Sequence, residues 1–146
     1  MNLRGNYPAK VDEKGRLKIP AMFLEGLKEF GNQFYITSPD GQSARIYPIK
    51  VWTQIEEKLA GVSSQNRVKR KFLMRTSYYG QSAELDAQGR VLLPAVLREF
   101  AQTKGEVDVF GQLNYLEVMN HARVLDELKN SPYTEEDFKA LDDLGI

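Results

Sequence analysis

Short segments with alternating apolar and polar residues recur along the chain. Such alternation predicts half-buried strands, because successive side chains of a strand point to opposite faces of a sheet. Alternating segments flank two Asp-x-x-Gly turns, and further apolar, β-rich runs occupy residues 33–37, 44–49, 106–111 and 114–119. Two short strands joined by a turn form a hairpin. The pattern therefore predicts four hairpins, two in each half of the chain.

Apolar residues at helical spacing predict four amphipathic helices between and after these hairpins. Two short helices begin after Pro20 and Pro94, since proline suits the first turn of a helix, where an N–H has no partner. Two longer helices are predicted over 51–62 and 121–130. Each half of the chain therefore has the predicted order strand, strand, helix, strand, strand, helix.

The two halves also share a sequence motif. Residues 9–21, AKVDEKGRLKIPA, align with residues 83–95, AELDAQGRVLLPA, and six of the thirteen positions are identical. Two copies are too few for a solenoid, so the similarity indicates an internal duplication. A unit of this length would bury too small a core to be stable alone. We therefore expect the hairpins of the two units to interleave in one barrel about a pseudo-two-fold axis.

The Asp-x-x-Gly part of each copy is typical of a turn. The side chains of Asp12 and Asp86 can accept hydrogen bonds from backbone N–H groups that follow, and Gly15 and Gly89 can adopt a positive φ. We predict that these four residues form the turns. In the second copy Leu92 replaces a lysine on the outer face of the strand, so we expect that face to be covered.

Composition argues against several classes of protein. The chain has 146 residues, no cysteine and one histidine, which excludes disulfides, thiolate nucleophiles and cysteine zinc sites. No apolar run is long enough to cross a bilayer, and the first ten residues lack the apolar region of a secretory signal. A cytoplasmic protein that binds no membrane fits these features.

An enzyme is also disfavoured. The sequence has no Gly-rich phosphate-binding loop of the G-x-x-x-x-G-K type. Asp12 and Asp86 resemble a duplicated carboxylate pair, but neither is followed by the Thr-Gly of an acid protease, and each has an arginine four positions on. We expect no catalytic residue, no metal, no cofactor and no small-molecule substrate.

Charge is distributed unevenly, although the net charge is zero. Residues 1–75 contain 14 Lys or Arg against 7 Asp or Glu, and residues 76–146 contain 6 against 13. This asymmetry indicates an anionic partner for the first half, or attraction between the halves or between copies of the chain.

The segment between the units concentrates this positive charge. We predict a basic linker helix over 63–80, with Ser63 or Ser64 as its cap and Arg67, Lys69, Arg70, Lys71 and Arg75 as its positive charges. These side chains could contact phosphates, or they could contact the acidic half of a neighbouring subunit. The tail over 131–146 is acidic. Tyr133 or Thr134 could begin a last short helix there that packs through Phe138 and Leu141, although we expect the tail to be poorly ordered.

Four sequence features together resemble the MraZ family of bacterial regulators, which belongs to the AbrB-like group. They are the paired D-x-x-G-R segments, Arg4-Gly5, the IYPI-x-x-W stretch and the basic NRVKRKF segment. The resemblance implies an α+β fold, a duplicated AbrB-like swapped-hairpin β-barrel (a double-split barrel) with short helices. The units would span 5–62 and 81–130. The resemblance also implies a ring-shaped, octamer-like homo-oligomer.

The resemblance further implies a sequence-specific DNA-binding transcriptional regulator, usually a repressor, associated with the division and cell-wall gene cluster. Such a protein binds short direct repeats in the promoter of its own operon and associates with the nucleoid. Arg16 carries over as the leading DNA contact, and Arg90 is its counterpart in the second copy. Lys10, Lys14 and Lys18 add positive charge to the first copy. The second copy is less basic, which leaves its part in DNA binding open.

Two alternatives remain at the level of sequence. Arg16 and Arg90 could pair with Asp12 and Asp86 across each turn, and a surface ion pair of this kind would stabilise little. Arginine on a turn can contact either a guanine edge or only phosphate. The rival function is a non-enzymatic, ring-forming scaffold whose basic surface binds protein.

Overall fold

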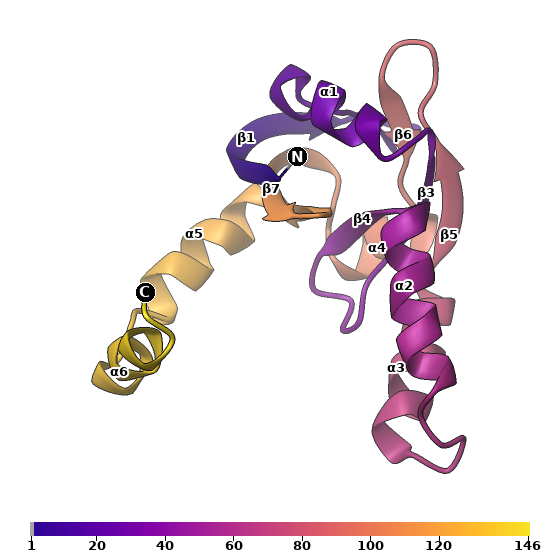
Figure 1. The fold of residues 1–146 in the computed structure, drawn as a ribbon. Helices are drawn as coiled ribbons and strands as arrows, with labels where there is room; N and C mark the ends of the chain where they lie inside the picture. Colours follow the sequence, from indigo (N-terminus) through magenta and orange to yellow (C-terminus); the bar gives the residue numbers. More distant parts are fainter. Residues whose placement is uncertain (1) are drawn as a thin grey trace.

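The computed structural model describes residues 2–146. Its strands are β1 (Leu3–Val11), β2 (Arg16–Lys18), β3 (Gln33–Thr37), β4 (Ala44–Pro48), β5 (Gln81–Glu84), β6 (Arg90–Leu92), β7 (Gly105–Leu113) and β8 (Leu116–Asn120). Its helices are α1 (Ala21–Glu29), α2 (Ile49–Ala60), α3 (Arg67–Tyr78), α4 (Ala95–Phe100), α5 (His121–Asn130) and α6 (Glu135–Asp143). Both halves have the predicted order of elements, with α3 between them and α6 after them (Figure 1).

The eight strands form one antiparallel sheet in the order β5-β3-β4-β8-β7-β1-β2-β6. Its two edge strands, β5 and β6, approach each other, which nearly closes the sheet into a barrel. If each strand is exchanged for its counterpart in the other half, the closed order is unchanged. The predicted fold, an α+β interleaved barrel with a pseudo-two-fold axis, is therefore confirmed.

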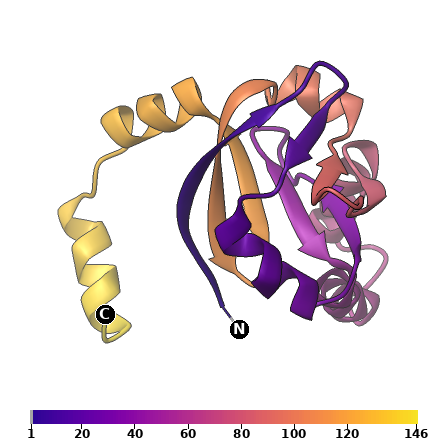
Figure 2. The ribbon, with the colours of Figure 1, turned by 90° about the horizontal axis from the view of Figure 1, so that it is seen from above.

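The barrel depends on strand pairs that join the two halves. The longest is β1 with β7, which runs from the pair Leu3–Leu113 to the pair Val11–Gly105. Strands β2 and β6, β3 and β5, and β4 and β8 also pair across the halves. Figure 2 shows β1 lying beside the strands of the second half around one barrel wall. Neither half has a complete sheet of its own, as the small size of each unit requires.

Three of the four predicted hairpins are present, and the fourth is wrong. Strands β1 and β2, β3 and β4, and β7 and β8 pair as expected. The turn before β6 does close, with the Asp86 N–H donating to the Arg90 carbonyl at 2.9 Å. However, β5 pairs with β3 and β6 pairs with β2. Strands β5 and β6 therefore stand at the two edges of the sheet, each paired on one side with a strand of the other half.

The core lies inside the barrel and draws equally on both motif copies. Leu17 and Ile19 from the first copy, and Val91 and Leu93 from the second, are at most 2% exposed. A second apolar cluster lies outside the barrel, where Trp52 of α2 stacks on Tyr35 of β3 and on Phe72 of α3. This cluster fixes α2 and α3 to the strands β3 and β4.

The serine cap expected for the linker helix is wrong, whereas the last short helix that Thr134 could begin is present. Helix α3 is capped by Asn66, whose side chain accepts a hydrogen bond from the Lys69 N–H at 2.9 Å, and not by the serines before it. The acidic tail forms a regular helix, α6, because Thr134 and Asp137 make a reciprocal capping box at its start. No residue of α6 is buried.

A histidine–carboxylate pair links α5 to the barrel and gives the stability a predicted pH dependence. The His121 Nδ1 lies 2.6 Å from the Asp108 Oδ2, and Asp108 is only 4% exposed. The hydrogen bond that the imidazole donates to the Asp108 carboxylate, the charge of that carboxylate and, to a smaller extent, Glu106 raise the pKa of His121. The folded pKa therefore exceeds that of the unfolded chain. This contribution is fully present below the ordinary histidine pKa and is lost as pH rises through the raised value.

We therefore expect His121→Gln to cost the most stability at acid pH. Urea unfolding of the parent and the variant between pH 5.5 and 8.5, a range chosen to span the ordinary histidine pKa of about 6.5, would measure the gap in unfolding free energy. The difference in unfolding free energy between parent and variant should shrink as His121 of the parent loses its proton. A gap that stays constant or widens over this range would contradict the assigned direction.

Candidate nucleic-acid interface

The first Asp-x-x-Gly turn is closed by hydrogen bonds to one carboxylate. The Asp12 Oδ1 accepts from the Lys14 N–H at 3.0 Å and from the Arg16 N–H at 2.9 Å. The Asp12 Oδ2 accepts from the Arg16 Nε at 2.8 Å. Gly15 has a φ of +87°, in the left-handed region that favours glycine. The sequence of this turn thus fixes both the backbone and the direction of the arginine.

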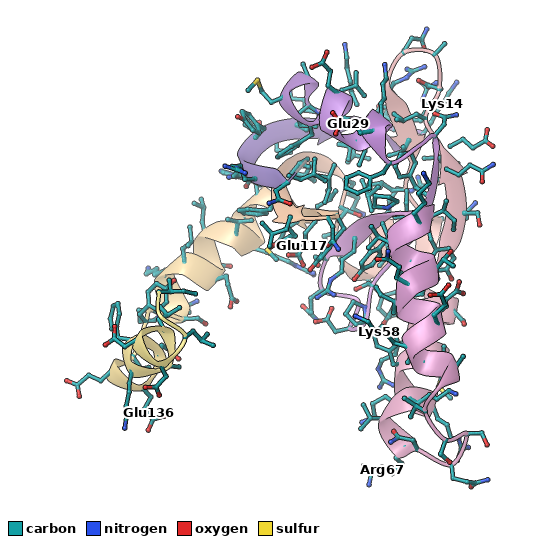
Figure 3. The ribbon with its side chains drawn as sticks, viewed as in Figure 1. Lys14, Glu29, Lys58, Arg67, Glu117 and Glu136 are labelled. Atoms are coloured by element: carbon teal, nitrogen blue, oxygen red, sulfur yellow. The ribbon has the colours of Figure 1, made fainter. Side chains whose placement is uncertain are left out.

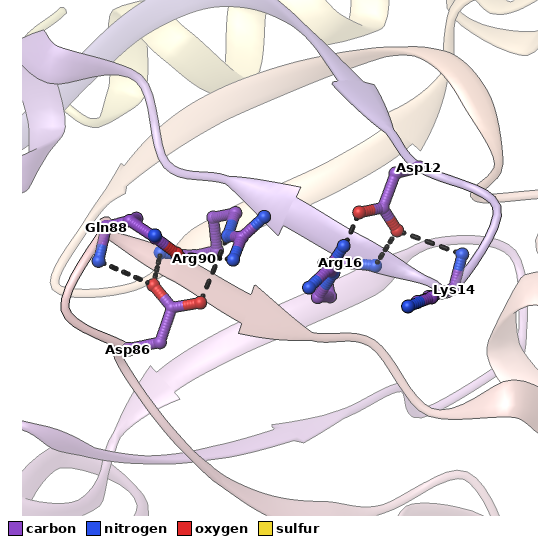
Figure 4. Close-up of polar contacts among 6 residues, drawn as sticks. All are labelled: Asp12, Lys14, Arg16, Asp86, Gln88 and Arg90. Carbon is purple, nitrogen blue, oxygen red and sulfur yellow. Dashed lines mark hydrogen bonds and ion pairs between the residues drawn. The ribbon is translucent and has the colours of Figure 1, made fainter.

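The second turn repeats this pattern of bonds. The Asp86 Oδ1 accepts from the Gln88 N–H at 2.8 Å and from the Arg90 N–H at 2.9 Å. The Asp86 Oδ2 accepts from the Arg90 Nε at 3.0 Å, and Gly89 has a φ of +74°. The two turns are shown together in Figure 4. The duplication in sequence is therefore a duplication in geometry.

Strands β2 and β6 bring the two turns into one structure. They pair antiparallel through Leu17 and Val91, which point into the core. The Ile19 N–H donates to the Gly89 carbonyl at 3.0 Å, and the Leu93 N–H donates to the Gly15 carbonyl at 2.9 Å. Each turn thus holds the end of the strand that follows the other turn. The result is a two-stranded ribbon with one Asp-x-x-Gly turn at each end.

Positive side chains lie on the outer face of this ribbon. Arg16 is paired in register with Leu92, and Lys18 with Arg90. Residues 74 positions apart in sequence therefore share one small surface, with Lys14 at the tip of the first turn. We call the outer face formed by Arg16, Lys18 and Arg90, together with Lys14, the basic ribbon.

The structure differs from the sequence predictions at two residues beside the basic ribbon, Leu92 and Lys10. Leu92 is 46% exposed, so the expectation that the chain covers this face is wrong. Lys10 lies on β1 directly opposite Glu106 of β7. The carboxylate of Glu106 offsets part of the positive charge that Lys10 would add to the surface.

The turn carboxylates are held in their charged form. The pKa of Asp12 is lowered, chiefly because its carboxylate accepts the Arg16 backbone N–H, and the pKa of Asp86 is lowered chiefly by the Arg90 backbone N–H. Each arginine uses its Nε for this ion pair. The arginines of the two copies differ in their outer nitrogens. The Arg90 Nη2 donates to Gln88, while among residues 2–146 the Nη atoms of Arg16 have no hydrogen-bond partner.

A fifth basic residue, which the sequence interpretation missed, lies behind the first turn. The guanidinium of Arg98, on α4, packs so closely over Gly15 that a Cβ there would lie 2.4 Å from the Arg98 Cζ. At the second turn the corresponding position is Leu24 of α1, which packs over Gly89. Positions 24 and 98 are again 74 apart, so the two residues hold equivalent places over the two turns, but an alignment of leucine with arginine gives no sign of the arginine's role.

This packing predicts the effect of a small substitution. We expect Gly15→Ala to lower the unfolding free energy by about 1–2 kcal/mol because alanine is strained in the left-handed conformation. The added methyl group must also displace Arg98, so the total loss should exceed this amount. Gly105→Ala is the matched control, since Gly105 has a φ of +66° with no heavy atom within 4 Å of the added Cβ. Urea denaturation of both variants measures the difference. Equal losses would show that the contact with Arg98 costs nothing.

Residues 2–146 were compared with the requirements of two other features, a metal site and a membrane-spanning helix. This part of the chain contains no group of three or more His, Asp or Glu side chains positioned to hold a metal ion. It also contains no helix that is both long enough and apolar enough to span a membrane.

Comparison with known proteins identifies the family. Residues 3–75 and 80–142 match the family described as "MraZ protein, putative antitoxin-like". The chain is 53% identical to the Transcriptional regulator MraZ of Acidobacterium capsulatum and 49% identical to that of Koribacter versatilis, in each case over 98% of this chain and 99% of the relative. It is 33% identical to that of Tolumonas auensis, over 97% of this chain and 91% of the relative. The chain therefore belongs to the MraZ family.

Proposed function

We propose that the chain is a DNA-binding transcriptional regulator that contacts duplex DNA through the basic ribbon. The names of its relatives support transcriptional regulation. The observation that carries the DNA contact is the pairing of β2 with β6, which gathers Arg16, Lys18 and Arg90 on one exposed face. The major groove of B-DNA admits a two-stranded β-ribbon, and arginine can read guanine there with two hydrogen bonds.

The turn carboxylates support this role instead of competing with it. Each ion pair uses the Nε of the arginine, so Asp12 orients the guanidinium of Arg16 while its Nη atoms remain available. An arginine held in this way loses less conformational entropy on binding. Arg98 behind the first turn adds positive charge to the same end of the ribbon. We therefore assign the main contact to the first copy and a weaker one to Arg90.

The proposed targets are short repeated boxes in the promoter of the chain's own operon, within a division and cell-wall gene cluster. The protein would bind them in the cytoplasm, at the nucleoid, and repress transcription of the operon. One basic ribbon is a small contact. Several ribbons in a ring-shaped homo-oligomer would bind repeated boxes with the added affinity of linked sites. A ring that used its basic surface to bind protein is the alternative function.

Hydroxyl-radical footprinting on the DNA upstream of the chain's own gene tests the proposal. We expect protection at regularly spaced positions, and loss of that protection when the protected boxes are shuffled. A single box should require a higher protein concentration than the array. Uniform weak protection of any sequence, or none, would overturn the proposal and favour the protein-binding scaffold.

A further inference from the structure

Helices α5 and α6 form an arm that leaves the barrel. In Figures 1 and 2 the arm, drawn in yellow tones, extends away from the strands. Only Val124 near its start is buried. Leu141 is half-buried, and six other large apolar side chains are more than half exposed: Leu125, Leu128, Tyr133, Phe138, Leu144 and Ile146. So much exposed apolar surface on one slender element is typical of a surface that another molecule covers.

The outer part of the arm combines this apolar surface with negative charge. Phe138 and Leu141 on α6, and Leu144 at its C-cap, follow one another at three-residue spacing and form a stripe along one face. Tyr133 extends the stripe by stacking on Phe138, with ring centroids 5.1 Å apart. Helix α6 contains five acidic residues and one lysine. The arm therefore offers an apolar stripe within an acidic surface.

Helices α2 and α3 form an apolar groove elsewhere on the molecule. The groove is lined by Ile55, Leu59, Val62, Val68 and Phe72, with Lys58 and Lys69 at its edge. Val68 is 75% exposed even though it lines the groove. The groove lies outside the basic ribbon and shares no residue with it.

The α3 side of this groove has a charge opposite to that of α6, while α2 on the other side carries two lysines and two glutamates. Helix α3 has five Lys or Arg side chains and no acidic residue over Arg67–Tyr78. Figure 3 shows Lys58 and Arg67 on this side of the molecule and Glu136 on the arm. An acidic helix with an apolar stripe is complementary both to the apolar groove and to the basic helix α3 on one side of it.

The arm and the groove of one chain lie apart. In both Figure 1 and Figure 2 helices α2 and α3 lie on the opposite side of the barrel from the α5–α6 arm. We propose that the α5–α6 arm of one copy binds the α2–α3 groove of a second copy. Such a contact joins two different surfaces, so it adds copies head to tail and closes into a ring where the rotation permits. It assigns the basic helix α3 to a subunit interface, the alternative that the sequence left open.

Variants in each surface test this contact by sedimentation velocity of the full chain. A single chain has a mass of 16.7 kDa, and we expect the parent to sediment as oligomers of more than two chains. Phe138→Gln with Leu144→Gln on the arm, or Val68→Glu in the groove, should raise the concentration for half assembly at least about tenfold. Met22→Glu is the matched control, because Met22 is 69% exposed on α1 and should leave assembly unchanged. All of these side chains are exposed, so the monomer fold should persist.

Mixing the two variants makes the test sharper. The groove variant retains an intact arm, and the arm variant retains an intact groove, so the mixture should form a complex of two copies that cannot extend. A monomeric parent would overturn the inference, as would arm variants that assemble like the parent. A mixture that stays monomeric would also overturn it.

This inference specifies the contacts of the proposed ring but not its DNA binding. A parent that binds its upstream DNA yet sediments as a monomer would refute the interface and leave the DNA-binding proposal intact. A parent that assembles as expected but does not bind its upstream DNA would refute the DNA-binding proposal and leave the interface intact.

Discussion

Arg16→Ala is expected to weaken binding to the upstream DNA by about 1–3 kcal/mol, or roughly 5- to 150-fold in Kd. The loss is large because the ion pair with Asp12 uses the Nε of this guanidinium and leaves its Nη atoms available to contact a base or phosphate. Arg90→Ala should cost less, since Gln88 already accepts a hydrogen bond from its Nη2. Titration of a fluorescent duplex with each variant gives both values.

The matched control for these variants is Lys28→Ala. Lys28 is exposed in the last turn of α1, outside the basic ribbon, the α5–α6 arm and the α2–α3 groove. Thermal unfolding would verify that all three variants remain folded. An Arg16→Ala protein that binds the duplex as tightly as the parent would remove the basic ribbon from the binding mechanism.

Gly111→Ala is expected to produce the largest loss of stability, at least about 3 kcal/mol, at the upper end of the cost of overpacking. Gly111 of β7 is paired with Gly5 of β1. A Cβ on Gly111 would lie 2.3 Å from the Arg4 backbone N and 2.5 Å from the Leu3 backbone carbonyl carbon. Backbone atoms cannot rotate away as a side chain can, so β1 must separate from β7.

Gly61→Ala provides the control for this substitution. Gly61 follows α2 with a φ of −79°, and a Cβ there would meet its nearest neighbour at 3.5 Å, an ordinary contact. Its unfolding free energy should change by less than about 0.5 kcal/mol. Urea unfolding midpoints that coincide for Gly111→Ala and the parent would show that β1 and β7 tolerate the wider separation.

The repeated motif predicted the fold correctly because the same residues must play the same part in each half. Leu17 and Val91 are equivalent in sequence and pair with each other across the pseudo-axis. The prediction that β5 and β6 pair as a hairpin was wrong. A turn sequence specifies the chain reversal at Asp86, but the partner of each strand is decided by packing between the halves.

The candidate site could be predicted only in part. Its individual residues follow from the motif, whereas the proximity of Arg16 to Arg90 depends on the register of β2 against β6. Arg98 was missed because its role comes from the packing of α4 over Gly15, not from the motif itself. The last short helix was predicted from Thr134 and is present as α6, where Thr134 and Asp137 form a capping box.

The most direct test of the proposed function is a fluorescence-anisotropy titration of the purified full chain at two salt concentrations. The ligands are the duplex from upstream of its own gene and a shuffled duplex of the same composition. The basic ribbon predicts tight binding to the native duplex alone, and affinity that falls steeply with salt as phosphate contacts release counterions. Equal affinity for both duplexes, or no binding at low salt, would contradict the proposal.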